Sequence, residues 1–564
     1  MKKVALLIPP YLGGRYFLQP PLGLLWTSTL LKNEGIDVKL YDLRVKPLSN
    51  NDYEALEYQY SYIVFCTSEL DIIQNYPVDY RFQYALSLCK KIKSITNAKI
   101  ILVGAHGSVF PEKIKSASGA DYIVVGEWEL AVRDIIVNSY DCTSIQRGKK
   151  GLFDTHLLPD YSLVDFDFYY GYSILSNDNV LTYDWSIVQS SRGCPFCCSF
   201  CYNFFGNDIQ YRSACDTYDD LKVQAKAGVK TIFFIDSVFG INRSITVELC
   251  QLLINNPLNV KLIVQTRASV LDKELLFLMK RAGFSGVWIG IESFDDSVLS
   301  ACGKGNTSKS NIEALRQIRE AGLVPAAFMI QGLPTQSIES SEADLQYLKD
   351  EGIRYNLSTL MLRPGSPLYD SNIGLLDDKA EQPWRTPLKY KGKTYTGESA
   401  NEALKLHRKY ARKRPITRDW QQKEKIAIWL SPEINHEEDC FKIINIVSGI
   451  SNKGIEPQIN LLAPNFFENP YFEEIVKYFS DTNLSVIITT IISNVREHEA
   501  VLSTIKGEVL FQAIDSSSVV EENDRSFLDE MNLLHKNTLF ESDYSCLFEW
   551  LNYNFSKYRE VFYI

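Results

Sequence analysis

Short apolar runs separated by amphipathic stretches fill the first 145 residues of the chain. Five of these runs predict strands, at Val4–Pro9, Ile36–Tyr41, Tyr62–Cys66, Lys99–Val103 and Tyr122–Val125. The stretch Gly23–Asn33 predicts a helix that ends before Gly35. This alternation predicts a doubly wound parallel sheet, whose ligand site lies at the carboxyl ends of the strands. Those ends carry the candidate ligand residues Thr67, Ser68, Gly104, His106, Gly126 and Glu127.

The same rhythm returns over residues 185–375. Strands are predicted at Thr231–Ile235, Lys261–Gln265, Gly286–Ile291, Ala326–Ile330 and Ser358–Leu362. Amphipathic stretches such as Asp272–Ala282 and Lys309–Ala321 predict helices between them. We therefore expect a partial (β/α) barrel, in which the chemistry is built at the carboxyl ends of the strands. Those ends carry Asp236, Gln265, Arg267, Glu292 and Gln331.

The last third of the chain predicts a second, smaller α/β domain. Its apolar runs are Lys425–Leu430, Gln458–Leu462, Leu484–Ile492 and Val509–Ile514, with helical patterns at Cys440–Ser451, Tyr471–Phe479 and Val495–Ile505. Two short matches to the first segment, at residues 424–428 and 453–455, weakly suggest duplication. The expected domains are 1–145, 185–375 and 416–564, joined by linkers at 146–184 and 376–415, the second with a charged connecting helix at 401–414.

Four closely spaced cysteines form the strongest motif. The run Gln189–Tyr202 contains Cys194, Cys197, Cys198 and Cys201. Three thiolates, with three and then two residues between them, can wrap one tight loop around an iron–sulfur cube. Three ligands leave one iron of a four-iron cluster open. A zinc site would need a fourth Cys or His at short spacing downstream, and the sequence has none.

Composition narrows the class of protein. The 564 residues are 45% hydrophobic and 23% charged, as expected of a globular protein of several domains. A net charge of −10 gives no reason to expect a nucleic-acid partner. No apolar run has the length of a membrane span, and Pro9 and Pro10 interrupt the first run too early for a secretion signal. The other cysteines are scattered, which favours a reducing compartment, the cytoplasm.

The cysteine run closely resembles the radical S-adenosylmethionine (SAM) family. The resemblance implies that Cys194, Cys198 and Cys201 hold a 4Fe-4S cluster, with Cys197 a bystander, and that the open iron binds SAM. It recurs at residues 282–283, 290–293, 303–305 and 332–334. Carried over position by position, it makes Phe200 the adenine-stacking residue and gives as further SAM contacts Gln265, Arg267, Glu292 and Gln331. The alternatives are core packing for Phe200 and a structural cap for each polar residue. Asp236 is a candidate for orienting substrate or capping a turn, and serving neither purpose is the third alternative.

The first segment is similar to the cobalamin-binding domain that precedes many radical SAM cores. The similarity rests on the order of residues 20–24, 34–38, 104–106 and 121–127. It implies that cobalamin contacts Thr67, Ser68, Gly104, His106, Gly126 and Glu127. The Asp-x-His-x-x-Gly motif is absent from the sequence, so we expect no histidine ligand to cobalt and a hydrogen-bonding role for His106. The alternative is a doubly wound domain that holds no corrin.

These resemblances imply a cobalamin-dependent radical SAM enzyme. The reaction expected is C-methylation of an unactivated carbon of a peptide or natural-product intermediate, through a 5′-deoxyadenosyl radical and methylcobalamin. An external electron donor such as flavodoxin or ferredoxin would be required. One alternative is a radical SAM cyclase, ring-rearranging enzyme or epimerase in which cobalamin is absent or is not a methyl donor. A second is a non-catalytic iron–sulfur electron carrier or binding protein.

Overall fold

The computed structural model divides the chain into two compact units, which are described separately. The first comprises Met1–Pro9, Tyr16–Arg44 and Asp52–Pro415, and the second Pro10–Arg15, Val45–Asn51 and Ile416–Ile564. The structure describes residues 2–9, 18–45, 48, 50–67, 79–138, 144–172, 181–183, 185–360, 363, 365–371, 406 and 409–410, together with six strands of the C-terminal part.

The first unit begins with a six-stranded parallel sheet. Its strands are β1 (Lys3–Ile8), β2 (Asp37–Asp42), β3 (Tyr62–Cys66), β4 (Lys99–Val103), β5 (Tyr122–Val125) and β6 (Ile145–Arg147), in the order β2-β1-β3-β4-β5-β6. The strands β1, β3 and β4 are buried almost throughout, as expected when helices cover both faces. The order reverses at β1, and in sheets of this kind ligands bind beyond the carboxyl ends at that point.

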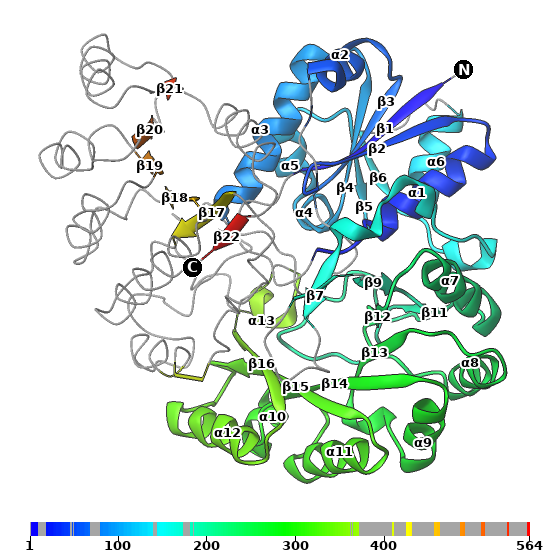
Figure 1. The fold of residues 1–564 in the computed structure, drawn as a ribbon, viewed down its shortest axis with the longest axis vertical. Coiled ribbons are helices and arrows are strands. Elements are labelled where there is room, and N and C mark those ends of the chain that lie inside the picture. The colour runs from blue at the N-terminus through cyan, green and yellow to red at the C-terminus, as the bar shows by residue number, and fades with distance from the viewer. Residues whose placement is uncertain are drawn as a thin grey trace, which may run out of the picture. The chain divides into compact units, whose positions relative to one another are not determined.

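Helices cover this sheet on both faces (Figure 1). The helices α1 (Leu22–Asn33) and α6 (Glu129–Asn138) contact each other on one face, and α3 (Asp79–Ile95) and α5 (Pro111–Ser118) on the other. Two further helices are α2 (Asn50–Tyr58) and the short α4 (Ala105–Val109), which follows β4. The predicted doubly wound sheet is therefore confirmed.

The segment after β6 packs against α1. It contains the 3-10 turns η1 (Leu152–Thr155), η2 (Tyr161–Leu163) and η3 (Phe166–Phe168) and the antiparallel strands β7 (Tyr170–Tyr172) and β8 (Leu181–Tyr183). The amide of Asp160 donates to the Leu25 carbonyl oxygen at 3.1 Å, and Ser28 Oγ donates to Asp160 Oδ2 at 2.6 Å. These bonds fix the segment to the first domain.

A second six-stranded parallel sheet forms the core of the first unit and curls into a half-barrel (Figure 1). Its strands, in the order β16-β15-β14-β13-β12-β9, are β9 (Trp185–Val188), β12 (Thr231–Phe234), β13 (Lys261–Thr266), β14 (Phe284–Glu292), β15 (Val324–Gln331) and β16 (Arg354–Thr359). The outer helices are α7 (Ala214–Lys226), α8 (Arg243–Asn255), α9 (Lys273–Arg281), α11 (Ser308–Glu320) and α12 (Ile338–Asp350). The smaller elements are β10 (Ser191–Arg192), β11 (Gln210–Tyr211), η4 (Ala268–Val270), α10 (Asp296–Ala301) and α13 (Pro367–Asp370).

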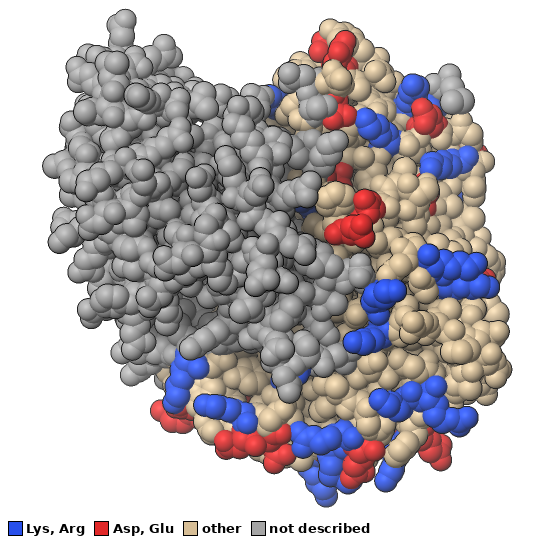
Figure 2. All heavy atoms as spheres, in the orientation of Figure 1, with Lys and Arg blue, Asp and Glu red and all other residues tan. Residues whose placement is uncertain are grey.

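Local sequence explains where the outer helices begin. The residue before each helix accepts a hydrogen bond from a backbone N–H of the first turn through its side chain, at Ser213, Asn242, Asp272, Thr307 and Ser337. On the face in Figure 2, both signs of charge are interspersed over these helices. Arg316 of α11, for example, pairs with Glu313 and Glu320.

One predicted strand is displaced. The apolar run Ser358–Leu362 predicts the last barrel strand, but β16 occupies Arg354–Thr359. This is the edge strand, and within it only Leu357 is buried. A search for continuous apolar runs finds strands covered on both faces and misses a half-exposed edge.

The second unit contains a parallel sheet of β17 (Lys425–Leu430), β18 (Glu456–Leu462), β19 (Ser485–Thr490), β20 (Val509–Ala513), β21 (Leu539–Phe540) and β22 (Val561–Tyr563). The order β21-β20-β19-β18-β17-β22 differs from that of the first sheet, so the two sheets are not simple repeats of one topology. The predicted helices of this unit, and most of residues 401–414, lie outside the described residues. The predicted fold class, with a doubly wound sheet, a partial barrel and a C-terminal α/β domain, is confirmed.

Candidate active site

The cysteine loop lies between β10 and β11, which pair as an antiparallel ribbon. Gly193 opens the loop with φ +98°, and a Cβ there would lie 2.6 Å from the Asp208 carbonyl oxygen. The Cys194 amide donates to the Gly206 carbonyl oxygen at 3.1 Å, and Asn203 Nδ2 donates to the Cys194 carbonyl oxygen at 2.9 Å. The backbone thus closes the loop on itself before any ligand binds.

The three predicted cluster ligands lie on this loop. Cys198 is buried and Cys194 half-buried, and the Cys201 amide donates to the Cys198 carbonyl oxygen at 3.0 Å. Burial raises the pKa of the Cys194 thiol and that of Cys201, the latter to about 11. Cys197 and Cys201 are both exposed by surface area, although the Cys201 thiol itself is largely desolvated, and Cys197 Sγ accepts from Asn207 Nδ2 at 3.7 Å. Exposure therefore does not separate Cys197 from the predicted ligands, and the assignment of Cys194, Cys198 and Cys201 stays a prediction.

No group of three His, Cys, Asp or Glu side chains in the described part of the chain is arranged to hold a single metal ion. The ligands of an iron–sulfur cube bind to different irons, so they need not converge on one point.

Arg267 lies beside the cysteine loop at the end of β13. Its Nη1 donates to Cys198 Sγ at 3.5 Å, and its Nη2 donates to the Lys304 carbonyl oxygen and, at 3.2 Å, to Asn306 Oδ1. The guanidinium carbon is 3.6 Å from the centroid of the Phe196 ring. Arg267 is 5% exposed, and its Nε has no hydrogen-bond acceptor among the described residues. A buried N–H without an acceptor is costly, so this atom is a candidate ligand contact.

Glu292 ends β14 with φ +66°, in the left-handed region that non-glycine residues rarely adopt. Lys304 Nζ donates to Glu292 Oε1 at 2.9 Å, and both side chains are buried. A Cβ at Gly290 would lie 2.7 Å from Glu292 Oε1 and 2.8 Å from Lys304 Nζ. A side chain at position 290 would therefore displace the ends of these two side chains.

Asp344 of α12 supports the turn that follows Glu292. Ser293 Oγ donates to Asp344 Oδ2 at 2.5 Å, and the Phe294 amide donates to Oδ1 at 3.0 Å. Burial raises the pKa of Asp344 to about 6. The carboxylate thus holds the backbone that sets the direction of Glu292.

Three other predicted SAM residues also lie in the core. Phe200 is half-buried and packs against a small apolar cluster, and Lys304 Nζ lies 5.9 Å from the centroid of its ring. Gln265 Nε2 donates to the Asp236 carbonyl oxygen at 2.9 Å, so this amide is already hydrogen-bonded to the end of the neighbouring strand. Gln331 is buried at the end of β15. The SAM contacts of these three residues stay predictions.

Asp236 caps the turn that leads into the cysteine loop. Its carboxylate accepts from the Ser190 amide at 3.0 Å and from the hydroxyls of Ser190 and Ser191 at 2.6 Å each. Burial raises its pKa. Of the two roles considered for Asp236, this geometry is that of the turn cap.

Hydrogen bonds join the predicted cobalamin residues at neighbouring strand ends of the first sheet. His106 Nδ1 lies 3.2 Å from Thr67 Oγ1, and burial lowers the pKa of His106 to about 3. Ser108 Oγ donates to the carbonyl oxygen of Gly104, which has φ +114°, and receives a bond from the Gly126 amide, both at 2.9 Å. The edges after β3, β4 and β5 are thereby held together.

Two predicted cobalamin residues stand apart. Ser68 lies outside the described residues. Glu127 is buried, and its carboxylate accepts from Gln210 Nε2 at 2.6 Å and from Arg192 Nη1 at 3.3 Å. Burial raises the pKa of Glu127. Its side chain thus faces the half-barrel.

Sequence reasoning missed several residues of this region. Lys304 was visible only as part of the Gly303-Lys304-Gly305 run, and nothing local marked it as the partner of Glu292. The residues Phe196, Asp344 and Arg192 carried no signal of their own, because their partners lie far away along the chain.

Two family models match the chain. The Radical SAM superfamily matches residues 188–348, and the B12 binding domain matches residues 10–136. The chain belongs to the cobalamin-dependent radical SAM enzymes. Its cofactors are those predicted, a 4Fe-4S cluster, SAM and cobalamin. None of the helices in the described part of the chain combines the length and hydropathy of a membrane span.

Several curated proteins are similar to this radical SAM enzyme. It is 25% identical over 382 residues to "Uncharacterized methyltransferase PH0819" of Pyrococcus horikoshii, an alignment that covers 63% of this chain and 78% of that protein. It is 24% identical to the anaerobic magnesium-protoporphyrin IX monomethyl ester cyclase of Rubrivivax gelatinosus, covering 59% and 62%. For the hopanoid C-2 methylase of Rhodopseudomonas palustris the identity is 26%, covering 32% and 37%.

Solved structures share the fold. The methyltransferase TsrM from Kitasatospora setae, with cobalamin and a 4Fe-4S cluster bound, superposes with a TM-score of 0.54 at 20% identity, covering 71% of this chain and 85% of that chain. OxsB with aqua-cobalamin and SAM bound gives 0.55 at 14% identity, covering 95% and 75%.

The residues present fit these cofactors. Three thiols on one closed loop are a suitable donor set for an iron–sulfur cluster, and the buried Nε of Arg267 is an unused donor beside them. At the first sheet, Gly126 has φ +85°, and a Cβ there would meet no atom within 4 Å. The backbone after β5 therefore has open space on this side, which leaves room for a ligand.

Proposed function

We propose that this enzyme transfers a methyl group to an unactivated carbon of a peptide or natural-product intermediate. The names of PH0819 and of the hopanoid methylase support methyl transfer. When bound, the cluster supplies the electron that cleaves SAM, and cobalamin carries the methyl group. The protein's own residues bind and orient the cofactors and the substrate, and they exclude water from the site.

The observation that carries the SAM-dependent part of this proposal is the environment of Arg267. Its Nη1 donates a hydrogen bond to Cys198 Sγ, and its buried Nε has no acceptor among the described residues. A carboxylate placed there would accept a charge-assisted hydrogen bond next to the cluster loop. We assign Arg267 to the SAM carboxylate on this basis.

Glu292 and Phe200 would hold the rest of SAM. The Glu292 carboxylate keeps Oε2 for a hydroxyl donor, while Lys304 neutralises its charge through Oε1. Phe200 offers an aromatic face to an adenine ring.

At the first sheet, we assign Thr67, Gly104 and Gly126 to the cobalamin edge and leave cobalt without a histidine ligand. His106 is neutral at physiological pH because burial lowers its pKa to about 3. Its Nδ1 is engaged with Thr67, which supports a structural role within the edge.

The first test is spectroscopic and isotopic. Protein purified anaerobically from cells supplied with cobalamin should contain about four iron atoms and one cobalt atom per chain and show corrin absorption bands. Incubation with SAM bearing a trideuterated methyl group, a reductant and small-molecule or peptide extracts of the native host should give a product that carries the label.

Arg267→Lys tests the assignment of the SAM carboxylate. We expect SAM affinity to fall roughly tenfold, because a lysine ammonium does not reproduce the guanidinium geometry. Arg281→Lys, an exposed arginine in α9, is the matched control and should bind SAM like the wild type. Unchanged SAM affinity in Arg267→Lys would contradict the assignment.

Ring formation is the second candidate. It is favoured by the similarity to anaerobic magnesium-protoporphyrin IX monomethyl ester cyclases of three organisms. An unlabelled product that has lost hydrogen, formed by protein with bound corrin, would favour this reaction over methyl transfer.

A further inference from the structure

Arg192 is a fully buried arginine next to the cluster loop. It is the last residue of β10, two positions before Cys194, and is 1% exposed. A guanidinium removed from water is tolerated only when its N–H groups and its charge are matched.

The groups that match it come mainly from the B12-binding domain. Arg192 Nη2 donates to Glu129 Oε1 at 2.6 Å, and Nη1 donates to Glu129 Oε2 at 3.2 Å and to Glu127 Oε2 at 3.3 Å. Its Nε donates to Gln189 Oε1 at 2.9 Å. The carboxylates of Glu127, just after β5, and of Glu129, at the start of α6, therefore pair with the guanidinium of Arg192.

Aromatic rings enclose the same guanidinium. Its central carbon lies 5.1 Å from the ring centroid of Trp26 in α1, 5.2 Å from that of Phe153 in η1 and 4.9 Å from that of Phe205 in the loop before β11. These rings come from the B12-binding domain, the connecting segment and the core. They exclude water, which strengthens the ion pairs.

The ion pairs of Arg192 matter because its partners lie next to the proposed cobalamin edge in the chain. Glu127 follows Gly126, the open glycine at the proposed cobalamin edge, and Gln210 of β11 binds the other oxygen of Glu127. Gly126 at the cobalamin edge is thus connected to Cys194, the first cluster ligand, through the ion pair of Glu127 with Arg192 and through Gly193. Because Arg192, Glu127 and Glu129 are all buried, we expect the cluster loop and the cobalamin edge to have little freedom to move separately.

We propose that Arg192 is a positioning residue that fixes the cluster loop against the cobalamin edge of the B12-binding domain. It acts through Glu127 and Glu129 and touches neither cofactor. This inference rests on the proposed function, because it concerns the relative placement of the two cofactors that methyl transfer requires.

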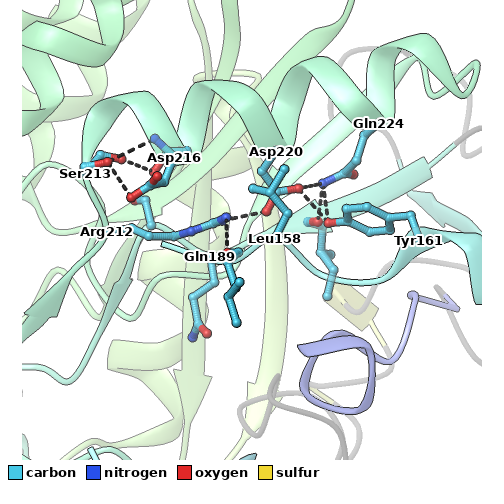
Figure 3. Close-up of polar contacts among 12 residues, drawn as sticks. Leu158, Tyr161, Gln189, Arg212, Ser213, Asp216, Asp220 and Gln224 are labelled. Atoms are coloured by element: carbon cyan, nitrogen blue, oxygen red, sulfur yellow. Dashed lines mark hydrogen bonds and ion pairs between the residues drawn. The ribbon is translucent and has the colours of Figure 1, made fainter. Parts of the chain in front are cut away.

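Arg212 provides a matched control. It is as buried as Arg192 and stacks on the same Trp26 ring, with 5.5 Å from its central carbon to the centroid. Its ion-pair partner is Asp220 of α7 at 2.6 Å, however, and that carboxylate also binds Tyr161 and Gln224 (Figure 3). The Arg212 ion pair therefore joins two residues of the core and reaches the connecting segment through Tyr161, but it includes no carboxylate of the B12-binding domain.

The experiment is hydrogen–deuterium exchange on the cofactor-loaded full chain. In Arg192→Lys, which keeps the charge and loses the fork of N–H donors, we expect exchange to rise roughly tenfold in peptides covering both 194–202 and 123–129. Iron and cobalt contents should stay at the wild-type level, and more SAM should be cleaved per product formed. Arg212→Lys should raise exchange near 158–161 and 212–224 and leave the cluster loop protected.

Two results would overturn the proposal: wild-type protection of both loops in Arg192→Lys, or equal loss of cluster-loop protection in Arg212→Lys. If Arg192→Lys does not fold, Glu127→Gln decides the question by the same exchange comparison, because it removes the longer ion pair and leaves one acceptor oxygen for the two donors Arg192 and Gln210. Failure of methyl transfer in the wild type would refute the proposed function and leave this comparison unaffected.

Discussion

At the scale of single residues, the site depends on how closely a few buried side chains pack. Gly290, Glu292 and Lys304 show this most directly, because the ion pair occupies the space where a side chain at position 290 would lie. Arg267 shows the opposite case, a buried donor that the described protein leaves without an acceptor. The ion pair of Glu292 with Lys304 favours a glycine at position 290, and the Nε of Arg267 points to a ligand.

Gly290→Ala should therefore separate Glu292 from Lys304. We expect the free energy of unfolding to fall by about 1–3 kcal/mol through overpacking, with weaker SAM binding. In a Lys304→Ala background the penalty of the alanine should shrink, because one of the two clashing atoms is gone. Denaturant unfolding of the four variants in this cycle measures the difference, and strictly additive penalties would show that the clash does not involve Lys304.

Asp344 gives a prediction for pH. Its pKa in the folded protein is about 6, above the ordinary value of 3.8. Between these two pH values the folded chain holds a proton on Asp344 that the unfolded chain has lost. The stability contributed by this group is complete at low pH and is lost as the pH rises through about 6. The loss amounts to about 3 kcal/mol in total and to about 2 kcal/mol between pH 4 and pH 7.

The variant Asp344→Asn stays neutral and can still bond to Ser293 and the Phe294 amide. Relative to the wild type, its free energy of unfolding should rise by about 2 kcal/mol between pH 4 and pH 7. Asp350→Asn, an exposed position on the same helix, should show no such trend. A constant difference between Asp344→Asn and the wild type across this range would disprove the assignment.

At the scale of elements, the loop between β10 and β11 is built by its backbone. Gly193 turns the chain in a left-handed conformation, and the Cys194 amide bonds back to Gly206. Sequence spacing alone marked the cysteines, but the antiparallel ribbon that carries them was not predicted. Its strands are only two residues long, too short for a periodic pattern.

Gly193→Ala should prevent the loop from closing, because its Cβ would collide with the Asp208 carbonyl oxygen. We expect iron bound after anaerobic reconstitution to drop at least severalfold. Gly206→Ala is the control, since Gly206 also has a positive φ but its nearest contact would be Lys150 Nζ at 3.9 Å. It should lose about 1 kcal/mol of stability and keep its iron. Equal iron loss in both variants would point to backbone strain as the cause.

At the scale of the whole molecule, the first unit unites the two cofactor domains. The segment between them packs on α1 through Asp160, and Arg192 joins the core to Glu127 and Glu129. Two parallel sheets with their loops held by such contacts can present two cofactors to one substrate. The second unit, with its different strand order, has no role that follows from the residues described.

The sequence by itself determined the fold class and the succession of the main strands and helices along the chain, and its cysteine motif predicted Cys194, Cys198 and Cys201 as the cluster ligands. These follow from periodicity and spacing, which are properties of neighbouring residues. Only the tertiary structure decided that Lys304 pairs with Glu292, that Asp344 supports the turn after it, and that Arg192 meets Glu129, 63 residues away in the sequence. Such partners depend on how distant segments pack, and a buried charge leaves no local pattern that would name its counter-ion.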